Sequence, residues 1–169
     1  MPGRRGALCL DAEHNHSLEG LVKSVEERLQ ALEDRAEIVD LIASYGPHAD
    51  SGNGRAIEEM WDAQGTYSFD TTTLEHSQLA GLVEFETHQN YMAAGCAHIL
   101  TPPTVRIDGD CAVAINYSLV FVNREEPWLA ERVSSNRWHL VRTEAGWRVA
   151  KRENRLLTGN PQAWELFSR

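Results

Sequence analysis

The sequence has few of the features that mark several large protein classes. Its three cysteines, Cys9, Cys96 and Cys111, are an odd number without a CxxC or Cys/His ligand spacing, which argues against a disulfide scaffold or a zinc site. No apolar run is long enough to span a bilayer, and the start lacks the apolar stretch of an export signal. Neither a glycine-rich phosphate loop nor an HExxH motif is present. These absences predict a soluble, cytoplasmic protein without a metal or an organic cofactor.

An excess of basic residues is also lacking. The formal net charge is −9, which argues against nucleic acid or an anionic membrane surface as the main partner. At 169 residues the chain has the size of one domain, long enough to bury a core. Residues 1–17 are polar and predict a poorly ordered N-terminal segment, and residues 18–169 predict the single domain.

The first half of this domain has a helical pattern. Apolar residues recur at steps of three and four and predict one buried helical stripe, which includes Leu18, Leu21, Val22, Val25, Leu29, Leu32, Ile38, Leu41, Ile42 and Tyr45. We expect Gly46-Pro47 to end it, because the residue before a proline avoids the helical region. A short helix over 55–61, a strand over 66–69, a loop over 70–73 and a helix over 79–94 follow.

The second half has the pattern of strands. The runs 97–107, 111–123, 131–143 and 147–157 are separated by turn sequences, and a short helix over 161–167 follows. Helices first and antiparallel strands afterwards predict an α+β fold with the helices packed on one face of a curved sheet.

Three stretches carry a resemblance to a known family. They are 32–38 leading to Tyr45 and Asp50, 95–98 leading into 107–110, and 140–152. With these motifs the sequence resembles the SnoaL-like branch of the NTF2-like superfamily, which groups with scytalone dehydratase, hexachlorocyclohexane dehydrochlorinase and the bile-acid dehydratases. The resemblance covers the chain from about Leu29 onward and implies a cone, in which a strongly curved, mostly antiparallel sheet and N-terminal helices enclose a deep apolar pocket.

The resemblance also implies site residues. In the dehydratase and dehydrochlorinase members an aspartate after the first helix faces a histidine on a strand, and these positions match Asp50 and His98. The arginine near the end of the strand after the Gly-Trp turn matches Arg152, and Tyr45 matches a tyrosine of the bile-acid dehydratases. The sequence departs from those dehydratases where they use a further aspartate, because Val120, Phe121 and Val122 stand near that place.

These residue types suit proton abstraction. A neutral imidazole can take up a proton near neutral pH, and a carboxylate on its other nitrogen fixes the tautomer and stabilises the imidazolium. We therefore expect His98 to be the base and Asp50 its orienting partner, while Tyr45 and Arg152 stabilise negative charge. Structural alternatives stay open: Asp50 as a cap of the helix near Arg55, His98 as a core histidine bonded to a backbone carbonyl, Tyr45 as an apolar helix contact, and Arg152 as part of a solvated or subunit-facing basic strand.

The predicted function is that of a cofactor-independent lyase (dehydratase-like elimination or retro-aldol cleavage) or isomerase acting on a hydrophobic cyclic or aromatic small molecule. Aromatic and polar side chains of the kind that line such pockets are Trp61, Tyr67, His88, Met92, Asn116, Tyr117, Asn136 and Trp138. Two alternatives remain, a non-catalytic subunit like the β subunits of ring-hydroxylating dioxygenases and a small-molecule binding protein. We expect a homodimer or homotrimer, because the sheet surface not used for the pocket needs cover by other subunits, and a closed oligomer of this chain alone would favour the enzyme.

Overall fold

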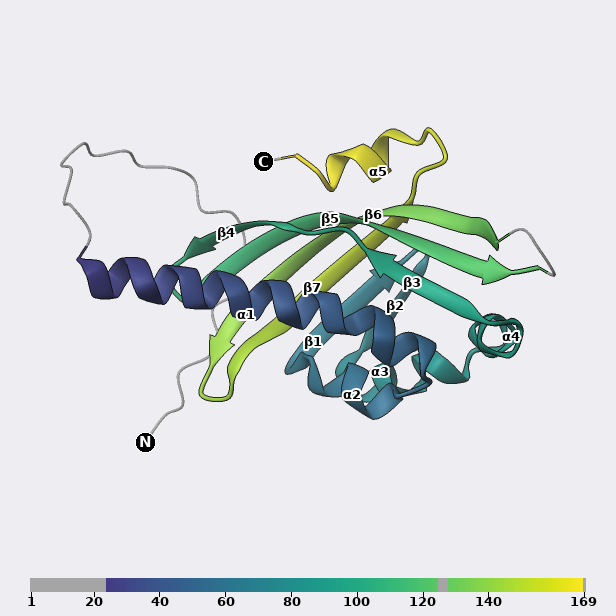
Figure 1. The fold of residues 1–169 in the computed structure, drawn as a ribbon, viewed down its shortest axis with the longest axis horizontal. Helices are drawn as coiled ribbons and strands as arrows, with labels where there is room; N and C mark the ends of the chain where they lie inside the picture. Colours follow the sequence, from purple (N-terminus) through teal and green to yellow (C-terminus); the bar gives the residue numbers. More distant parts are fainter. Residues whose placement is uncertain (1–23, 125–127, 169) are drawn as a thin grey trace.

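A seven-stranded sheet forms the centre of the computed structural model, which describes residues 24–124 and 128–168 (Figure 1). Its strands are β1 (Trp61–Phe69), β2 (Thr72–Glu75), β3 (Cys96–Leu100), β4 (Thr104–Asp108), β5 (Cys111–Asn123), β6 (Trp128–Thr143) and β7 (Gly146–Leu156). The strand order is β2-β1-β7-β6-β5-β3, and β4 pairs with β5 beyond the end of β3. All pairs are antiparallel except β1 with β7, so the α+β prediction is confirmed, with a curved sheet that does not close.

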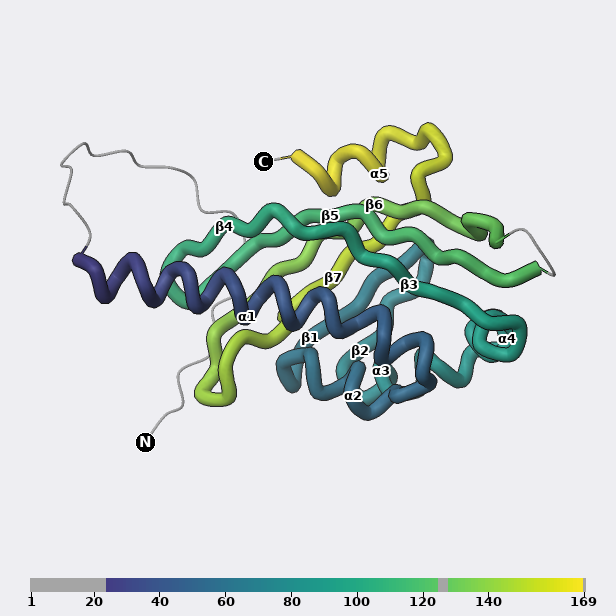
Figure 2. Tube along the Cα trace, in the orientation of Figure 1, coloured from purple at the N-terminus to yellow at the C-terminus, as the bar shows by residue number. Residues whose placement is uncertain are grey.

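Helices lie on both sides of this sheet. They are α1 (Val25–Asp50), α2 (Gly54–Glu59), α3 (His76–Leu79), the 3-10 helix η1 (Ala80–Glu84), α4 (Glu86–Ala94) and α5 (Pro161–Glu165). The long α1 runs along one face with the short helices near its C-terminal end, and α5 lies on the opposite face (Figures 1 and 2). No described helix has both the length and the apolar character needed to cross a membrane.

Several predicted boundaries were wrong. Trp61, expected in a helix, begins β1, and the expected loop after Phe69 contains β2. The helix predicted over 79–94 is divided into the end of α3, η1 and α4. The run 97–107 forms two strands, because Pro102 and Pro103 have no N–H to donate to the sheet. The predicted N-terminal segment, 1–17, lies outside the described residues.

Helix α1 begins with a capping box and differs from its prediction at both ends. The Ser24 hydroxyl accepts from the backbone N–H of Glu27, and the Glu27 carboxylate accepts from that of Ser24. Its first turns project beyond the core, so Val25, Leu29 and Leu32 are exposed and not part of a buried stripe. The buried stripe is Ile38, Ile42, Tyr45 and Ala49, whose spacing keeps one side of the helix against the sheet.

The C-terminal end of α1 continues through Gly46-Pro47 to Asp50. A Cβ on Gly46 would collide with the backbone carbonyl oxygen of His98, so this glycine allows α1 to lie directly against β3. The Pro47 carbonyl still accepts from the N–H of Ser51 at 3.1 Å, which keeps the last turn closed. The prediction of a helix end at Gly46 was therefore wrong because packing against β3 outweighs the local cost of the proline.

The inner face of the sheet is set by strand alternation. On β5 the even-numbered residues from Ala112 to Val122 point inward, and on β6 those from Arg132 to Leu140 share this face. Asn116 pairs with Asn136, and Val120 pairs with both His98 and Arg132. The inner face is therefore apolar around Ala112 and Leu140, polar around Asn116 and Asn136, and has Val120 beside His98.

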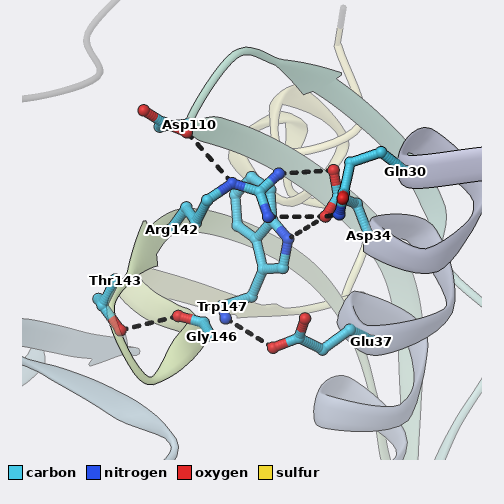
Figure 3. A network of polar contacts seen from close by, with 8 residues as sticks. All are labelled: Gln30, Asp34, Glu37, Asp110, Arg142, Thr143, Gly146 and Trp147. Carbon is cyan, nitrogen blue, oxygen red and sulfur yellow. Dashed lines mark hydrogen bonds and ion pairs between the residues drawn. The ribbon is translucent and has the colours of Figure 1, made fainter. Parts of the chain in front are cut away.

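A polar network fastens α1 to the β6–β7 hairpin (Figure 3). Arg142 donates two hydrogen bonds to the Asp34 carboxylate, at 2.7 and 2.5 Å, and a third to Asp110 at 3.1 Å. Its guanidinium lies 4.6 Å from the ring centre of Trp147, whose backbone N–H donates to Glu37 at 2.7 Å. The Arg142 hydrogen bond is the largest influence that lowers the pKa of Asp34, to about 2. We call Asp34, Arg142, Asp110, Trp147 and Glu37 the hairpin clamp.

Candidate active site

Asp50 and His98 meet where the end of α1 packs against β3. The His98 Nδ1 atom lies 2.6 Å from Asp50 Oδ1, and because a carboxylate only accepts, Nδ1 carries the proton in this bond. The backbone N–H of His98 donates to both Asp50 oxygens, at 2.9 and 3.1 Å. His98 is 8% exposed, and its Nε2 atom has no hydrogen-bond partner among the described residues. The carboxylate thus fixes both the tautomer and the orientation of the ring.

The surroundings of this pair favour a charged aspartate. Burial on its own raises the pKa of the Asp50 carboxyl, but the hydrogen bonds from the His98 ring and backbone outweigh it, so the pKa lies below its ordinary value. Asp50 is also the last residue of a 26-residue helix. The negative end of that helix dipole lies beside His98 and would stabilise an imidazolium there.

The structural alternatives for these two residues are not what the structure shows. The side chain that caps α2 belongs to Asn53, which accepts from the N–H of Ala56 at 3.1 Å. The histidine bonded to a backbone carbonyl is His88, whose Nε2 lies 2.9 Å from the oxygen of Ala49. The ring of His98 instead contacts a carboxylate.

Two further side chains surround the pair. Cys96, a free thiol, donates to Asp50 Oδ1 at 3.3 Å, and burial together with this bond raises the pKa of the thiol to about 12. His88 lies with its ring centre 5.2 Å from that of His98, and burial lowers its pKa, which favours the neutral form.

Asp50, Cys96 and His98 are also the one group among the described residues whose potential metal-ligand atoms all lie within 4.8 Å of one another. In the present geometry these atoms bond to each other, with the thiol and the Nδ1 proton both directed at the carboxylate. A metal would have to displace both protons, so the arrangement fits a hydrogen-bonded acid–base group better than a preformed ligand set.

His98 lines a small cavity together with residues from β1, β3, β5, β6, β7 and α1. The volume is about 10 Å³, space for about one water molecule. Its lining is Tyr45, Tyr67, His98, Leu100, Ser118, Val120, Arg132, Arg152 and Asn154. The part of the expected pocket that His98 lines is therefore a narrow, partly polar space, with long aromatic and arginine side chains in its wall.

Arg152 is the most unusual of the lining residues. It is 2% exposed, and its guanidinium lies over the rings of Tyr45, Tyr67 and Trp138 at 4.1, 4.4 and 4.2 Å from their centres. Its Nε and Nη2 atoms donate to the Asn136 side-chain oxygen at 3.1 and 2.9 Å, and Nη1 has no partner among the described residues. The prediction of a solvated or subunit-facing arginine was wrong for this residue, because its side chain points into the fold.

Tyr45 lies beneath this guanidinium and is 4% exposed. Burial is the main cause of the raised pKa of its hydroxyl, with a further contribution from Tyr67. The hydroxyl therefore stays protonated and can donate a hydrogen bond to a ligand in the cavity. Its ring also packs edge-on against Trp61 and Trp138, so Tyr45 belongs to both the core and the cavity wall.

Of the eight side chains predicted to line the pocket, one lines the cavity and two lie directly behind its wall. Tyr67 lines the cavity, and Asn136 and Trp138 contact Arg152 from behind the wall. Four of the others do not line it. Trp61 is in the core, Asn116 bonds Trp138 and Thr101, the His88 ring is tilted against that of His98, and Met92 packs near Gly52.

Tyr117 needs the clearest correction. It is 43% exposed on the outer face and packs against Phe167, with 4.8 Å between ring centres. Adjacent residues of a strand point to opposite faces, so Asn116 and Tyr117 could not both face the pocket.

Five lining residues were missed as site residues: Leu100, Ser118, Val120, Arg132 and Asn154. Strand alternation could have found most of them, because counting by two from Asn116 reaches Ser118 and Val120 on β5. The same count backwards from Asn136 reaches Arg132 on β6. Arg132 was missed because an arginine near the start of a predicted strand is usually expected to face the solvent.

The chain is similar in sequence and in fold to proteins of a known family. The SnoaL-like domain family matches residues 30–153 of the chain. An NTF2-like protein with a cystatin-like fold from Novosphingobium aromaticivorans is 42% identical, with a TM-score of 0.83 over 88% of this chain and 99% of that one. No curated protein matches the chain.

More distant structures share the fold alone. Aln2 from a Streptomyces species is 18% identical, with a TM-score of 0.64 over 72% of this chain and 89% of that one. Hexachlorocyclohexane dehydrochlorinase LinA-type3 from Novosphingobium barchaimii is 16% identical, with a TM-score of 0.66 over 77% of this chain and 90% of that one.

Proposed function

The chain belongs to the SnoaL-like family of NTF2-like proteins, a group that includes enzymes such as the dehydrochlorinase, and on this premise we propose that it is itself an enzyme. Its reaction begins with removal of a carbon-bound proton from a hydrophobic cyclic or aromatic small molecule. Loss of a leaving group or return of the proton to another carbon completes an elimination or an isomerisation. In retro-aldol cleavage the base removes the proton of a β-hydroxyl group instead, and the carbon–carbon bond breaks to leave an enolate. His98, Asp50, Tyr45 and Arg152 perform it without a cofactor.

The observation that carries this proposal is the 2.6 Å bond between Asp50 and the Nδ1 atom of His98, on a histidine that lines the cavity. With Nδ1 protonated and bound, the basic lone pair is on Nε2, which has no partner among the described residues. His98 Nε2 takes the proton from carbon, and the ionised Asp50 stabilises the imidazolium that forms. The same nitrogen then returns the proton to the leaving group or to another carbon.

Tyr45 and Arg152 act on the negative charge that develops on the substrate. The Tyr45 hydroxyl remains protonated and can donate to an enolate or leaving-group oxygen. The guanidinium of Arg152 is held by three rings and an amide, so it stabilises that charge without having to reorganise. The fold likeness to a dehydrochlorinase is compatible with this chemistry, because loss of HCl also requires removal of a carbon-bound proton.

Variants of His98 test the proposal directly. Ring compounds with an acidic C–H beside a carbonyl or a leaving group, hexachlorocyclohexane among them, are incubated in D₂O with the wild-type chain. Deuterium incorporation and product release are followed by NMR. We expect His98→Ala to lose about 10²–10⁴-fold in rate. His76→Ala, which changes a partly exposed histidine on α3, is the control that keeps full activity. Full activity of His98→Ala would refute the proposal.

One observation favours a second candidate, a non-catalytic subunit or a binding protein. The cavity of about 10 Å³ is far too small for a ring compound unless side chains move. A non-catalytic subunit would co-purify with a larger partner, and a binding protein would retain a ligand without turnover. Pull-down from the source cell and mass spectrometry of the purified chain distinguish these two from the enzyme.

We further propose that the chain forms a homodimer or homotrimer through the outer face of the sheet. Ile99 and Val133 on this face are 48% and 37% exposed, and Tyr117 lies beside them, which supports association there. Light scattering coupled to size-exclusion chromatography gives the mass, and a monomer at micromolar concentration would contradict this expectation.

A further inference from the structure

The cavity wall has an unusual charge balance. Two of its residues, Arg132 and Arg152, are guanidinium cations, and no aspartate or glutamate lines it. The chain as a whole has 25 acidic and 16 basic residues, so carboxylates are abundant elsewhere. Within the described residues neither arginine forms an ion pair. A buried positive space in an acidic protein indicates that the missing negative charge comes with a ligand.

Arg152 is the fully buried one of the two arginines in the cavity wall. Rings and an amide oxygen surround its guanidinium, but none of them carries the full negative charge that a buried cation requires. Its Nη1 atom is buried and has no acceptor among the described residues. Asn136 has an unpaired buried Nδ2 beside it, while its oxygen accepts from Arg152 and from Asn154 at 2.9 Å. Turning the amide would set its NH₂ against these donors, so the Asn136 oxygen remains directed at Arg152.

Arg132 is the partly exposed arginine of the cavity wall. Its backbone pairs with Val120, which pairs with His98, so the three residues form one row across the inner face of β6, β5 and β3. A register shift in the β5–β6 pairing lies directly before it, between Val120 and Phe121, and such irregularities redirect nearby side chains. Burial raises the pKa of Tyr45 and lowers that of His88, and the charge of Arg132 has a smaller lowering influence on both groups, which agrees with a side chain directed inward.

We propose that the cavity binds the carboxylate of a small organic acid between Arg152 and Arg132, and that these arginines select acids over their neutral analogues. Arg152 Nη1 donates to one carboxylate oxygen and Arg132 to the other. Because the cavity has room for only about one water molecule, the Arg132 side chain on the partly exposed side has to shift to admit the acid. The carboxylate is not cleaved: Arg152 holds it, and the charge of the same guanidinium stabilises the negative charge that develops beside it. If the proposed function holds, it fixes the acid so that a C–H bond elsewhere in the molecule faces His98 Nε2.

Paired probes of equal shape test the site without a known substrate. Acetate, benzoate and cyclohexanecarboxylate are each compared with the corresponding amide at constant ionic strength, by isothermal titration calorimetry and ligand-observed NMR. We expect at least one acid to bind about tenfold or more tightly than its amide, because only the acid brings a charge to the two guanidinium groups.

Variants at the accessible arginine keep the test independent of folding. Arg132→Gln should weaken binding of that acid by about tenfold while Arg132→Lys keeps part of it. Arg106→Gln, which removes the same charge from an exposed position on β4, should have no effect. Equal binding of each acid and its amide, no binding of any acid, or an equal loss in Arg106→Gln would overturn the proposal.

The two proposals can fail separately. His98→Ala should still discriminate acid from amide, because the anion site does not use the base. Discrimination without proton exchange in any probe would retain the anion site and count against the enzyme. Exchange on neutral and acidic probes alike, with no loss in Arg132→Gln, would retain the enzyme and reject the anion site.

Discussion

Helix α1 carries two aspartates that reach the sheet, and their partners differ in kind. Asp34 binds Arg142, a permanent cation whose donors are shared between Asp34 and Asp110 and whose face is covered by Trp147. Asp50 binds His98, whose second ring nitrogen has no partner among the described residues and which lines a cavity. The first site is saturated and the second is not.

The two arginines repeat this contrast. Arg142 and Arg152 both lie over aromatic rings, yet Arg142 has two carboxylates and Arg152 has none among the described residues. Saturated polar groups hold a fold together, whereas buried groups with unused hydrogen-bonding capacity need a ligand or a reaction to explain them. The hairpin clamp therefore serves stability, and the end of α1 is where chemistry is expected.

The largest effect should come from Asp50→Asn. The amide keeps the shape but loses the charge that stabilises the imidazolium, so we expect the rate to fall by about 10³–10⁴-fold while the fold stays intact. The deuterium-exchange assay gives the rate, and thermal melting gives the stability. Full activity of Asp50→Asn would contradict a catalytic role for Asp50.

Asp34→Asn should reverse that pattern. The variant leaves Arg142 without its buried counter-charge, and because Arg142 is partly exposed and can regain water, we expect a loss of about 2–3 kcal/mol in the free energy of unfolding. The rate per folded molecule should not change. Asp110→Asn is the matched control: it removes the other Arg142 partner, which is 82% exposed, and should cost less than about 1 kcal/mol. Equal losses in both variants would contradict the central place of Asp34 in the hairpin clamp.

Helices and strands could be predicted from the sequence more reliably than the contacts between them. Alternation predicted β5 with the bounds that the structure has, because both of its faces have a regular pattern. The contact of Asp50 with His98 joins residues 48 positions apart, and no local pattern encodes it; only the family resemblance predicted it.

The misses have tertiary causes. The end of α1 was predicted too early, because the contact of Gly46 with the backbone of His98 is invisible in the helix sequence. Arg132 was missed because its inward direction depends on pairing between β5 and β6. The size of the cavity depends on how several long side chains pack together, which spacing does not determine.

Low pH should remove the contribution of Asp34 to the free energy of unfolding. The folded pKa of Asp34 is about 2 and its ordinary value is 3.8, so the ionised form is favoured by folding. The stability from Asp34 is therefore fully present above about pH 4 and is lost as the pH falls towards about 2. Urea unfolding between pH 2 and pH 7 should show the difference between wild type and Asp34→Asn shrinking over that window. A difference that stays constant down to pH 2 would assign the stability to packing and not to charge.

The smallest effect should come from Cys96, the weakest donor to Asp50. A thiol at 3.3 Å contributes little beside a ring N–H at 2.6 Å, so Cys96→Ser and Cys96→Ala should each change the rate by less than about threefold. With a pKa of about 12, only about one thiol in 10⁴ is ionised at pH 8, so alkylation by iodoacetamide should be slow in the folded protein. Fast alkylation, or a large rate loss in Cys96→Ala with Cys96→Ser active, would make the thiol a working part of the site. The unsaturated end of α1 would then have three acid–base groups in place of two.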